Sequence, residues 1–288
     1  MAKDMILKKI CDNQNYLASV TSEYDKGGHL LISDSEIDYT NDWNFILNRK
    51  APVVTGGQYA EGYLFTMKRS SDSNKDDVAM VFAFKEEIQS SVKGKWSPLG
   101  MRGTQSIPME FKGVLNKDRI LNASSFKNTA KIYMIPIGHI MWASSWLGSI
   151  KAAFKQIIQI IRKNKQKRSS EIVLSKISET RLLIDTVDVY LKSIIEQYTQ
   201  HLGEDKKEVD WDKFSIHINN LKLLSSENLY KAINIIVEIA GMYYGYQQTE
   251  DNNFERTLRD LRSASIMFQN DRLKEINGKL SLFNSEIS

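Results

Sequence analysis

Residues 96–114 read WSPLGMRGTQSIPMEFKGV, and the chain differs in character before and after this stretch. Gly100 and Gly103 are spaced as in a tight turn, with the basic Arg102 between them. From Ile107 to Val114 apolar and polar residues alternate, which is typical of a half-buried strand. The stretch therefore predicts a turn that leads into a strand.

The residues before this stretch predict further strands. Short alternating runs are separated by clusters of Gly, Asn and Asp, and the expected strands lie within residues 14–23, 29–39, 43–48, 51–57, 63–69 and 78–84. The polar run 70–77, SSDSNKDD, predicts an exposed hairpin turn. Regularly spaced strands without intervening helices predict an antiparallel β-barrel or sandwich, which we assign to residues 1–125.

The residues after it predict long helices. All four prolines lie at or before Pro136, so none interrupts the second half. Apolar residues recur at helical spacing, and the expected helices span residues 137–163, 169–198 (with Ser169 or Ser170 as N-cap), 212–244 and 254–282. The pair Ser225–Ser226 could interrupt the third helix. Residues 126–288 are therefore predicted to form a four-helix up-down bundle, which makes the fold class α+β.

Composition excludes several classes of function. Hydrophobic residues make up 42% and charged residues 26% of the chain, as in ordinary globular proteins. No apolar run is long enough for a membrane span and the N-terminus lacks a signal-peptide core, which favours a cytoplasmic protein. A net charge of +4 is too small to indicate nucleic-acid binding. Cys11 and the four scattered histidines show no metal-ligand spacing, and Cys11 is expected to be a small buried residue. The basic run 162–168, RKNKQKR, could attract phosphate, although a solvated helix end explains it as well.

Several motifs resemble the acyl-CoA dehydrogenase family in their order along the chain. The matching segments are 21–28 (a TEPxAGSD-like loop), 47–56 (LNGxAPWVTG-like), 99–106 (LGMRGTxS), 147–153 (LGxxxAA-like) and 245–260 (GYxxxxPxERxxRD-like). The resemblance covers the middle β-domain and the C-terminal helical domain of that family. It starts at the β-domain, so either a second chain supplies the family's N-terminal helical domain, which we expect, or the cleft that this domain would line is open.

The resemblance implies FAD as cofactor and an acyl thioester, on coenzyme A or a carrier protein, as substrate. Thr55 is the best candidate for a flavin contact and Ser22 the next, because a hydroxyl can hydrogen-bond the edge of the flavin ring. Val53 occupies the place of the aromatic residue that shields the flavin. Gly245 and Asn270 are further candidate cofactor contacts, and Gly28 and Arg256 are candidate substrate contacts. Ordinary strand and turn roles explain Thr55 and Ser22 equally well.

The chain also departs from the family at positions that bind the cofactor. Arg49 stands where the LNG motif has glycine. The arginine motif that binds the pyrophosphate is replaced by NKQKR at 164–168. Met242 and Tyr243 stand in place of two glycines that admit the cofactor across an oligomer interface.

The catalytic base is absent from both positions at which the family carries a glutamate. Phe268 occupies the usual position, and Gly138, beside His139, occupies the alternative one. His139 and Asp271 are weak substitutes, because a histidine at a helix start and an acid on a helix surface more often have capping or surface roles. Asp260 is expected to pair with an arginine such as Arg256.

Three functions remain open. The first is one chain of a split or heteromeric flavoprotein that oxidises an acyl thioester. The second is a catalytically inactive structural or regulatory subunit without flavin. In either case we expect a homo- or hetero-oligomer formed through the bundle surface that includes Trp142, Trp146, Tyr243 and Tyr244, although ordinary core packing also explains these aromatic residues. The third is a flavin-dependent oxygenase, which needs no glutamate. A flavin band that appears only with a partner chain would favour the first.

Overall fold

The computed structural model describes residues 2–24, 29–121, 126–203, 209–250 and 252–284. The chain divides into two compact units. Unit 1 comprises residues 1–98 and 102–130, and unit 2 comprises residues 99–101 and 131–288. Residues 96–114 are thus divided between the two units, because Leu99–Met101 belong to unit 2 while the residues on both sides belong to unit 1.

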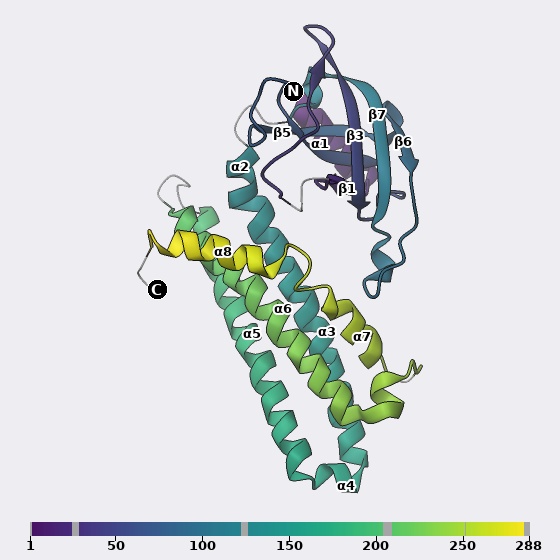
Figure 1. The fold of residues 1–288 in the computed structure, drawn as a ribbon, viewed down its shortest axis with the longest axis vertical. Coiled ribbons are helices and arrows are strands. Elements are labelled where there is room, and N and C mark those ends of the chain that lie inside the picture. Colours follow the sequence, from purple (N-terminus) through teal and green to yellow (C-terminus); the bar gives the residue numbers. More distant parts are fainter. Residues whose placement is uncertain (1, 25–28, 122–125, 204–208, 251, 285–288) are drawn as a thin grey trace. The chain divides into compact units, whose positions relative to one another are not determined.

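Unit 1 is a sandwich of two β-sheets (Figure 1). Its strands are β1 (Leu17–Val20), β2 (Asp38–Tyr39), β3 (Asn44–Val54), β4 (Gly62–Lys68), β5 (Val78–Phe84), β6 (Gln89–Val92) and β7 (Ile107–Asn116). One sheet has the order β1-β4-β5 and the other β2-β3-β7-β6. The Phe111 ring of β7 meets the rings of Tyr63 and Phe65 of β4 at centroid distances of 4.9 and 5.1 Å, so the two sheets share one core. A sandwich is confirmed, and the described strands do not close into a barrel. The sheets are antiparallel except that β1 runs parallel to β4.

Two strand predictions were wrong for identifiable reasons. The runs 43–48 and 51–57 form the single strand β3, whose pairing with β7 shifts register between Ala51 and Val54, and Pro52, which cannot donate a ladder hydrogen bond, lies in this bulge. Residues 29–39 are extended only at Asp38–Tyr39. The backbone N–H groups of Asp34 and Ser35 donate to the Glu23 carboxylate instead of a strand.

The N-terminus is helical, which the sequence reading missed. Helix α1 (Ala2–Asn13) places Ile6 against Phe82 and Phe84. Cys11 lies exposed on this helix, so the expectation that it is buried was wrong. The polar run 70–77 connects β4 to β5, which pair from Gly62 to Phe84, and the predicted hairpin is confirmed.

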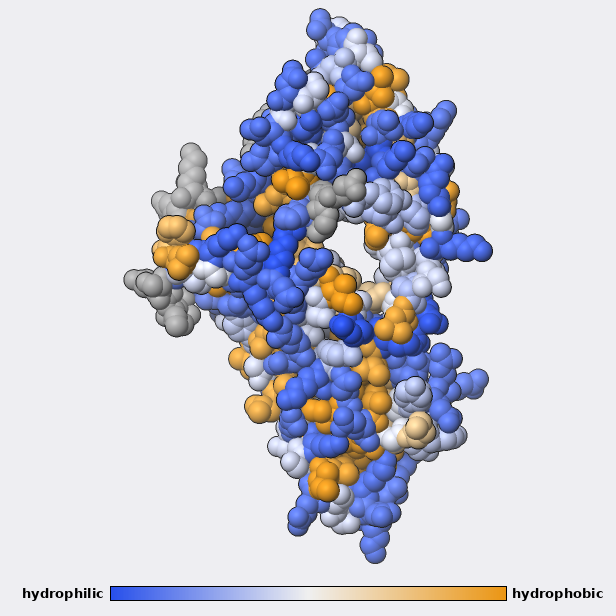
Figure 2. Space-filling model, in the orientation of Figure 1, coloured by the Kyte–Doolittle hydropathy of each residue, from blue (hydrophilic) through white to orange (hydrophobic). Residues whose placement is uncertain are grey.

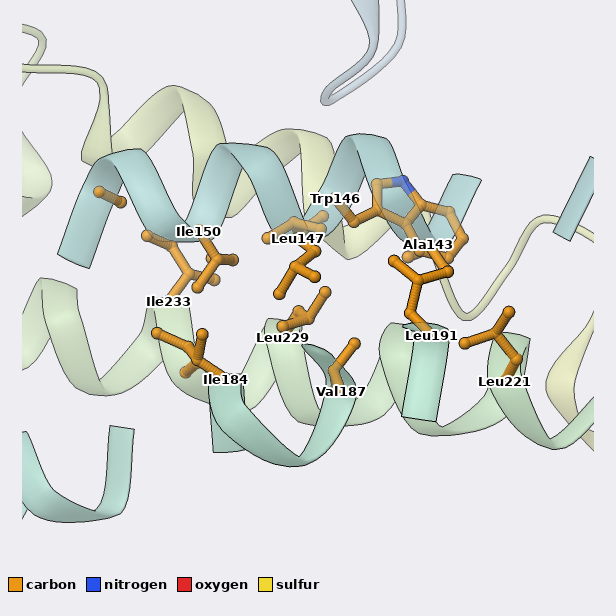
Figure 3. Close-up of a cluster of buried hydrophobic side chains, with 14 of the residues drawn as sticks. Ala143, Trp146, Leu147, Ile150, Ile184, Val187, Leu191, Leu221, Leu229 and Ile233 are labelled. Atoms are coloured by element: carbon orange, nitrogen blue, oxygen red, sulfur yellow. The ribbon is translucent and has the colours of Figure 1, made fainter. Parts of the chain in front are cut away.

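Unit 2 is a helical bundle (Figure 1). Helix α2 (Phe126–Thr129) belongs to unit 1, and a π-helical turn at Ala130–Met134 leads into α3. The bundle helices are α3 (Ile135–Lys163), α4 (Lys165–Arg168), α5 (Glu171–Gly203), α6 (Trp211–Gly241), α7 (Phe254–Arg262) and α8 (Asn270–Ser281). A second π-helical turn, η6 (Met242–Tyr246), follows α6. Side chains of α3, α5 and α6 interlock along the axis of the bundle (Figure 3).

The helix ends explain where the bundle differs from the prediction. The Ser170 hydroxyl accepts from the Val173 N–H at 3.4 Å and caps α5 as expected. Helix α6 continues through Ser225 and Ser226, because their hydroxyls bond to backbone carbonyls one turn earlier. The predicted fourth helix is two helices, α7 and α8. Between them Phe268 and Gln269 have φ values of 55° and 28°, which a continuous helix cannot contain.

The four aromatic residues expected on the bundle surface differ in how far they are buried. Trp146 is buried, Trp142 and Tyr244 are half-buried against the core, and Tyr243 is 61% exposed. Figure 2 shows hydrophobic residues distributed among hydrophilic ones on the visible surface of the bundle. None of the described helices is both long and apolar enough to cross a membrane.

Candidate functional site

In unit 1 three hydroxyl groups lie in a row at the end of β3. The Thr55 Oγ1 is 2.9 Å from the Ser106 Oγ, which is 2.8 Å from the Thr104 Oγ1. Ser106 is buried whereas Thr55 is exposed, and the Gly56 N–H donates to the Thr104 carbonyl at 3.0 Å, which holds the two segments together. Each hydroxyl has one proton and two lone pairs, so Thr55 keeps hydrogen-bonding capacity for a ligand.

The Ser22 hydroxyl makes two hydrogen bonds to the backbone of Val53. It donates to the Val53 carbonyl at 2.7 Å and accepts from the Val53 N–H at 3.3 Å. The Ser22 proton is therefore used to join the loop after β1 to the bulge of β3. The Val53 side chain itself is 44% exposed. Gly28 lies outside the described residues.

Unit 1 contains a buried ion pair whose arginine donates to the Ser22 carbonyl at 3.0 Å. The Arg49 guanidinium is fully buried and pairs with the Glu23 carboxylate. Glu23 also accepts from the Ser33 hydroxyl at 3.1 Å and from the Asp34 and Ser35 N–H groups at 3.0 and 2.8 Å. Burial lowers the pKa of Arg49 to about 9, so the guanidinium is still charged at neutral pH. The alternation of β3 could have revealed that Arg49 is buried, because it occupies a core-facing position between Leu47 and Ala51, but the alternation does not identify Glu23 as its partner.

In unit 2 aromatic rings gather around Phe268, one of the two positions that the resemblance assigns to a base. At the other position, Gly138, a Cβ atom would meet nothing within 4 Å. The ring of His139, next to Gly138, contacts the Phe268 ring at a centroid distance of 5.5 Å. Trp142 stacks on His139 at 5.7 Å and meets Phe268 at 5.7 Å. Two segments that are far apart in sequence therefore form one aromatic cluster, which we call the His139–Trp142–Phe268 cluster.

His139 is held as a neutral imidazole. Its Nδ1 lies 3.3 Å from the Ile218 carbonyl oxygen, and because a carbonyl only accepts, Nδ1 carries the proton. The pKa of His139 is lowered to about 4, mainly by burial, while the hydrogen bond to the Ile218 carbonyl raises it and the nearby Lys222 cation lowers it. The other ring nitrogen, Nε2, is buried and has no hydrogen-bond partner among the residues that the structure describes.

A buried polar network joins α6 to the start of α8. The Lys222 ammonium is buried and donates to the Asn270 Oδ1 at 2.6 Å, and the Asn270 amide donates to Ser226 and Glu227. Burial lowers the pKa of Lys222 to about 8. Asn270 thus has partners within unit 2. Nothing in the helical periodicity marks Lys222 as buried, so the sequence reading missed this network.

Other predicted site residues also have local roles. Asp271 is exposed in the first turn of α8, where an acid is favoured by the helix dipole. Gly245 is required by packing, because a Cβ atom there would lie 2.4 Å from the Val237 carbonyl oxygen. In the NKQKR run, the Lys167 ammonium donates to the carbonyls of Ile239 and Ala240 at 2.7 and 3.2 Å and so caps α6.

Arg256 lines a groove between α3 and α7. The groove has a volume of about 340 Å³, and its walls include Trp146, Ser149 and Gln156 of α3. Asp260 lies 3.7 Å from Arg256, so the predicted pair is confirmed. The Asp260 carboxylate also accepts from the Met101 N–H at 2.5 Å.

The Leu99–Met101 segment packs tightly on α7, and Gly100 makes this possible. A Cβ atom on Gly100 would lie 2.1 Å from the Arg259 carbonyl oxygen, whereas one on Gly103 would meet nothing within 4 Å. We expect Gly100→Ala to destabilise unit 2 by about 1–3 kcal/mol, because backbone must move to admit the methyl group. Gly103→Ala is the matched control and should leave stability nearly unchanged in urea unfolding. Equal losses in the two variants would contradict the packing described here.

The chain is similar in sequence to one known domain family and in fold to several solved structures. Residues 131–268 match the family model of the acyl-CoA dehydrogenase C-terminal domain. Among curated proteins none matches the sequence. Similar solved structures include FMN-bound TdsC from a Paenibacillus species (16% identity, 97% of this chain and 73% of that chain, TM-score 0.81). They also include butyryl-CoA dehydrogenase from Megasphaera elsdenii (16% identity, 94% and 69%, TM-score 0.81) and the prolyl acyl carrier protein oxidase AnaB (18% identity, 94% and 69%, TM-score 0.77).

Proposed function

We propose that this chain is one part of a flavin-dependent oxidoreductase acting on an acyl thioester. The chain has the acyl-CoA dehydrogenase fold, and its residues 131–268 match the model of that family's C-terminal domain. Two structurally similar proteins, a butyryl-CoA dehydrogenase and a prolyl acyl carrier protein oxidase, are named for coenzyme A and carrier-protein substrates. The observation that carries the proposal is the row of hydroxyl groups that ends at the exposed Thr55, because the resemblance assigns a flavin contact to Thr55.

The exposed end of the hydroxyl row, Thr55, fits the ring of a flavin. Thr55 presents a hydroxyl that Ser106 and Thr104 orient from behind, and the exposed Val53 side chain offers an apolar surface beside it. A flavin bound there would supply the hydride acceptor. The residues of this chain would bind its ring edge through Thr55 and keep water from one face through Val53.

The pyrophosphate of FAD fits less well to the matched residues of this chain. Lys167 is used in capping α6, and Met242 is 70% exposed where a small residue would admit the cofactor. We therefore propose that FAD, if it is the flavin used, takes its pyrophosphate contacts from a partner. A second chain that supplies a helical domain would also cover exposed apolar side chains, and those on the described surface of unit 2 include Met141, Met242 and Tyr246.

A second candidate function is a non-catalytic subunit without flavin. The hydrogen bonds from the Lys167 ammonium to the α6 carbonyls favour this non-catalytic candidate, because that cation is then not available to bind phosphate. The same fold would then stabilise a dehydrogenase-like partner. Flavin binding separates the two candidates.

Thr55→Val tests the flavin contact directly. We expect flavin affinity to fall about 10-fold, because the variant removes one hydrogen bond and preserves shape, and a net hydrogen bond is worth about 0.5–1.5 kcal/mol. Flavin fluorescence titration measures the change. The matched control is Thr40→Val, an exposed threonine whose hydroxyl bonds to the Asn44 carbonyl. Equal affinities of the Thr55→Val variant and the unmodified chain would exclude Thr55 as a contact.

A further inference from the structure

The groove between α3 and α7 lies within unit 2, and the function proposed above does not use it (Figure 1). Its volume of about 340 Å³ is within the range of small-ligand sites, about 300–1,000 Å³. The α3 wall carries small side chains, which leave the space between the helices unfilled, and the α7 wall carries polar ones. The two walls include Ser145, Ser149, Ala152, Asn253, Arg256 and Thr257. The groove therefore has room and hydrogen-bonding groups for a small ligand.

The deepest part of the groove is apolar. Trp146, Ala153 and Leu261 line it and are at most 5% exposed. The Trp146 indole N–H has no hydrogen-bond partner among the residues that the structure describes. Figure 3 shows the indole nitrogen on the side of the ring that faces away from the labelled side chains of α5 and α6. A buried indole N–H usually has a partner, so this donor suits an acceptor atom of a ligand.

Among the described residues that line the groove, Arg256 is the only basic one. Its Nε lies 3.7 Å from the Asp260 carboxylate, which is too far for a hydrogen bond. That carboxylate already accepts from the Met101 N–H at 2.5 Å. The Arg256 side chain is 67% exposed, and the planar fork of N–H groups on a guanidinium matches a carboxylate through two parallel hydrogen bonds. The groove therefore presents a cation whose hydrogen bonds are unused.

The polar groups beside Arg256 suit a single negative charge. Asn253 is the N-cap of α7, but its side chain makes no capping hydrogen bond and lines the groove instead. The positive end of the α7 dipole thus adjoins the groove. The side chains of Gln156 and Thr257 have no partner within the described part of the chain and can hydrogen-bond the rest of a ligand. Because Asp260 shares the one cation, the lining matches a carboxylate better than a phosphate dianion.

We propose that this groove, which we call the Arg256 groove, binds a small monocarboxylate that has an apolar body. The carboxylate pairs with Arg256, and the body covers Trp146 and Leu261. This ligand is additional to the acyl thioester and the flavin of the proposed function, and the role of Arg256 differs from the substrate contact that the resemblance implies. The Arg256 groove belongs to unit 2 and the hydroxyl row to unit 1, so flavin binding and carboxylate binding are tested separately.

Ligand-observed NMR with 3-phenylpropanoate tests the proposal on the full chain, with any partner that it retains on purification. We expect saturable binding, and about 10-fold weaker binding of the neutral isostere 3-phenylpropanamide, because a charged acceptor strengthens the hydrogen bonds to Arg256. Arg256→Gln should remove this preference by weakening carboxylate binding about 10-fold. The matched control is Arg181→Gln, because Arg181 also pairs with an acid one turn further along its helix and is 66% exposed. It should bind as the unmodified chain does.

A second pair of variants tests the location of the site. Ser149→Phe places a ring in the Arg256 groove and should abolish binding. Ser144→Phe is the matched control, because both serine hydroxyls bond to a carbonyl one turn earlier on α3 and the described lining does not include Ser144. Circular dichroism shows that each variant is folded.

Three results would overturn the proposal. They are no saturable binding to the unmodified chain, unchanged carboxylate binding in a folded Arg256→Gln or Ser149→Phe variant, and tighter binding of benzyl phosphate than of 3-phenylpropanoate. A carboxylate preference that depends on Arg256 in a chain that binds no flavin would support this site and contradict the function proposed above.

Discussion

Glu23→Gln is expected to destabilise unit 1 by about 3–5 kcal/mol, the usual cost of removing one partner from a buried ion pair. Arg49 and Glu23 side chains are 0% and 6% exposed, so solvent cannot compensate the guanidinium that remains. Glu23 also accepts hydrogen bonds from Ser33, Asp34 and Ser35, and the amide would satisfy only some of them. Urea unfolding followed by circular dichroism measures the loss.

The double variant Glu23→Leu with Arg49→Met separates charge from packing. Replacing both members of a buried pair by apolar residues is often neutral, so it should recover much of the stability. The matched surface control is Asp185→Asn, which breaks the exposed pair with Arg181 and should cost about 0.5 kcal/mol or less. If Glu23→Gln cost no more than Asp185→Asn, the buried pair would not organise unit 1.

The second large effect is a loss of stability in acid that His139 causes. The pKa of His139 is about 4 in the folded chain, compared with its ordinary 6.5 when unfolded. Below pH 6.5 the unfolded chain therefore takes up a proton that the folded chain resists. The free energy of unfolding therefore decreases as the pH falls, and the loss due to His139 reaches about 3 kcal/mol near pH 4.

A pair of variants isolates this histidine from the carboxylates that titrate in the same range. The free energy of unfolding of His139→Gln should decline less steeply between pH 6.5 and 4 than that of the unmodified chain. His217→Gln is the control, because burial lowers the pKa of His217 as well but that side chain is only half-buried. Parallel curves for the unmodified chain and His139→Gln would contradict a neutral, buried His139.

Local patterns predicted the order and type of most elements. The strands β4, β5 and β7 and the helices α3, α5 and α6 follow from alternation or helical spacing, because a buried face imposes its period on the sequence. Long-range contacts account for the failures. Residues 29–39 alternate like a strand, but the Glu23 carboxylate takes their N–H groups. The break between α7 and α8 is hidden because apolar residues such as Ala264 and Met267 continue the helical spacing through it.

The candidate site was less predictable than the fold. Counting along motifs gave Phe268 and Gly138 as the two base positions, and the structure places the ring of His139, the neighbour of Gly138, against Phe268. Counting could not show that the Ser22 proton is used by Val53 or that Asn270 holds Lys222, because both depend on tertiary packing. The hydrogen-bond partners of Lys222 and the pairing of Glu23 with Arg49 could be found only in the three-dimensional structure. A charged residue in an apolar sequence pattern does not show which residue it will contact.

The visible absorbance spectrum shows whether this chain forms part of a flavoprotein. The full chain is purified alone and after co-expression with candidate partner proteins that contain a helical domain. We predict a flavin band in the complex that Thr55→Val weakens and an acyl thioester bleaches. A stable complex with no flavin band, even after added FAD or FMN, would contradict the claim and leave a structural subunit.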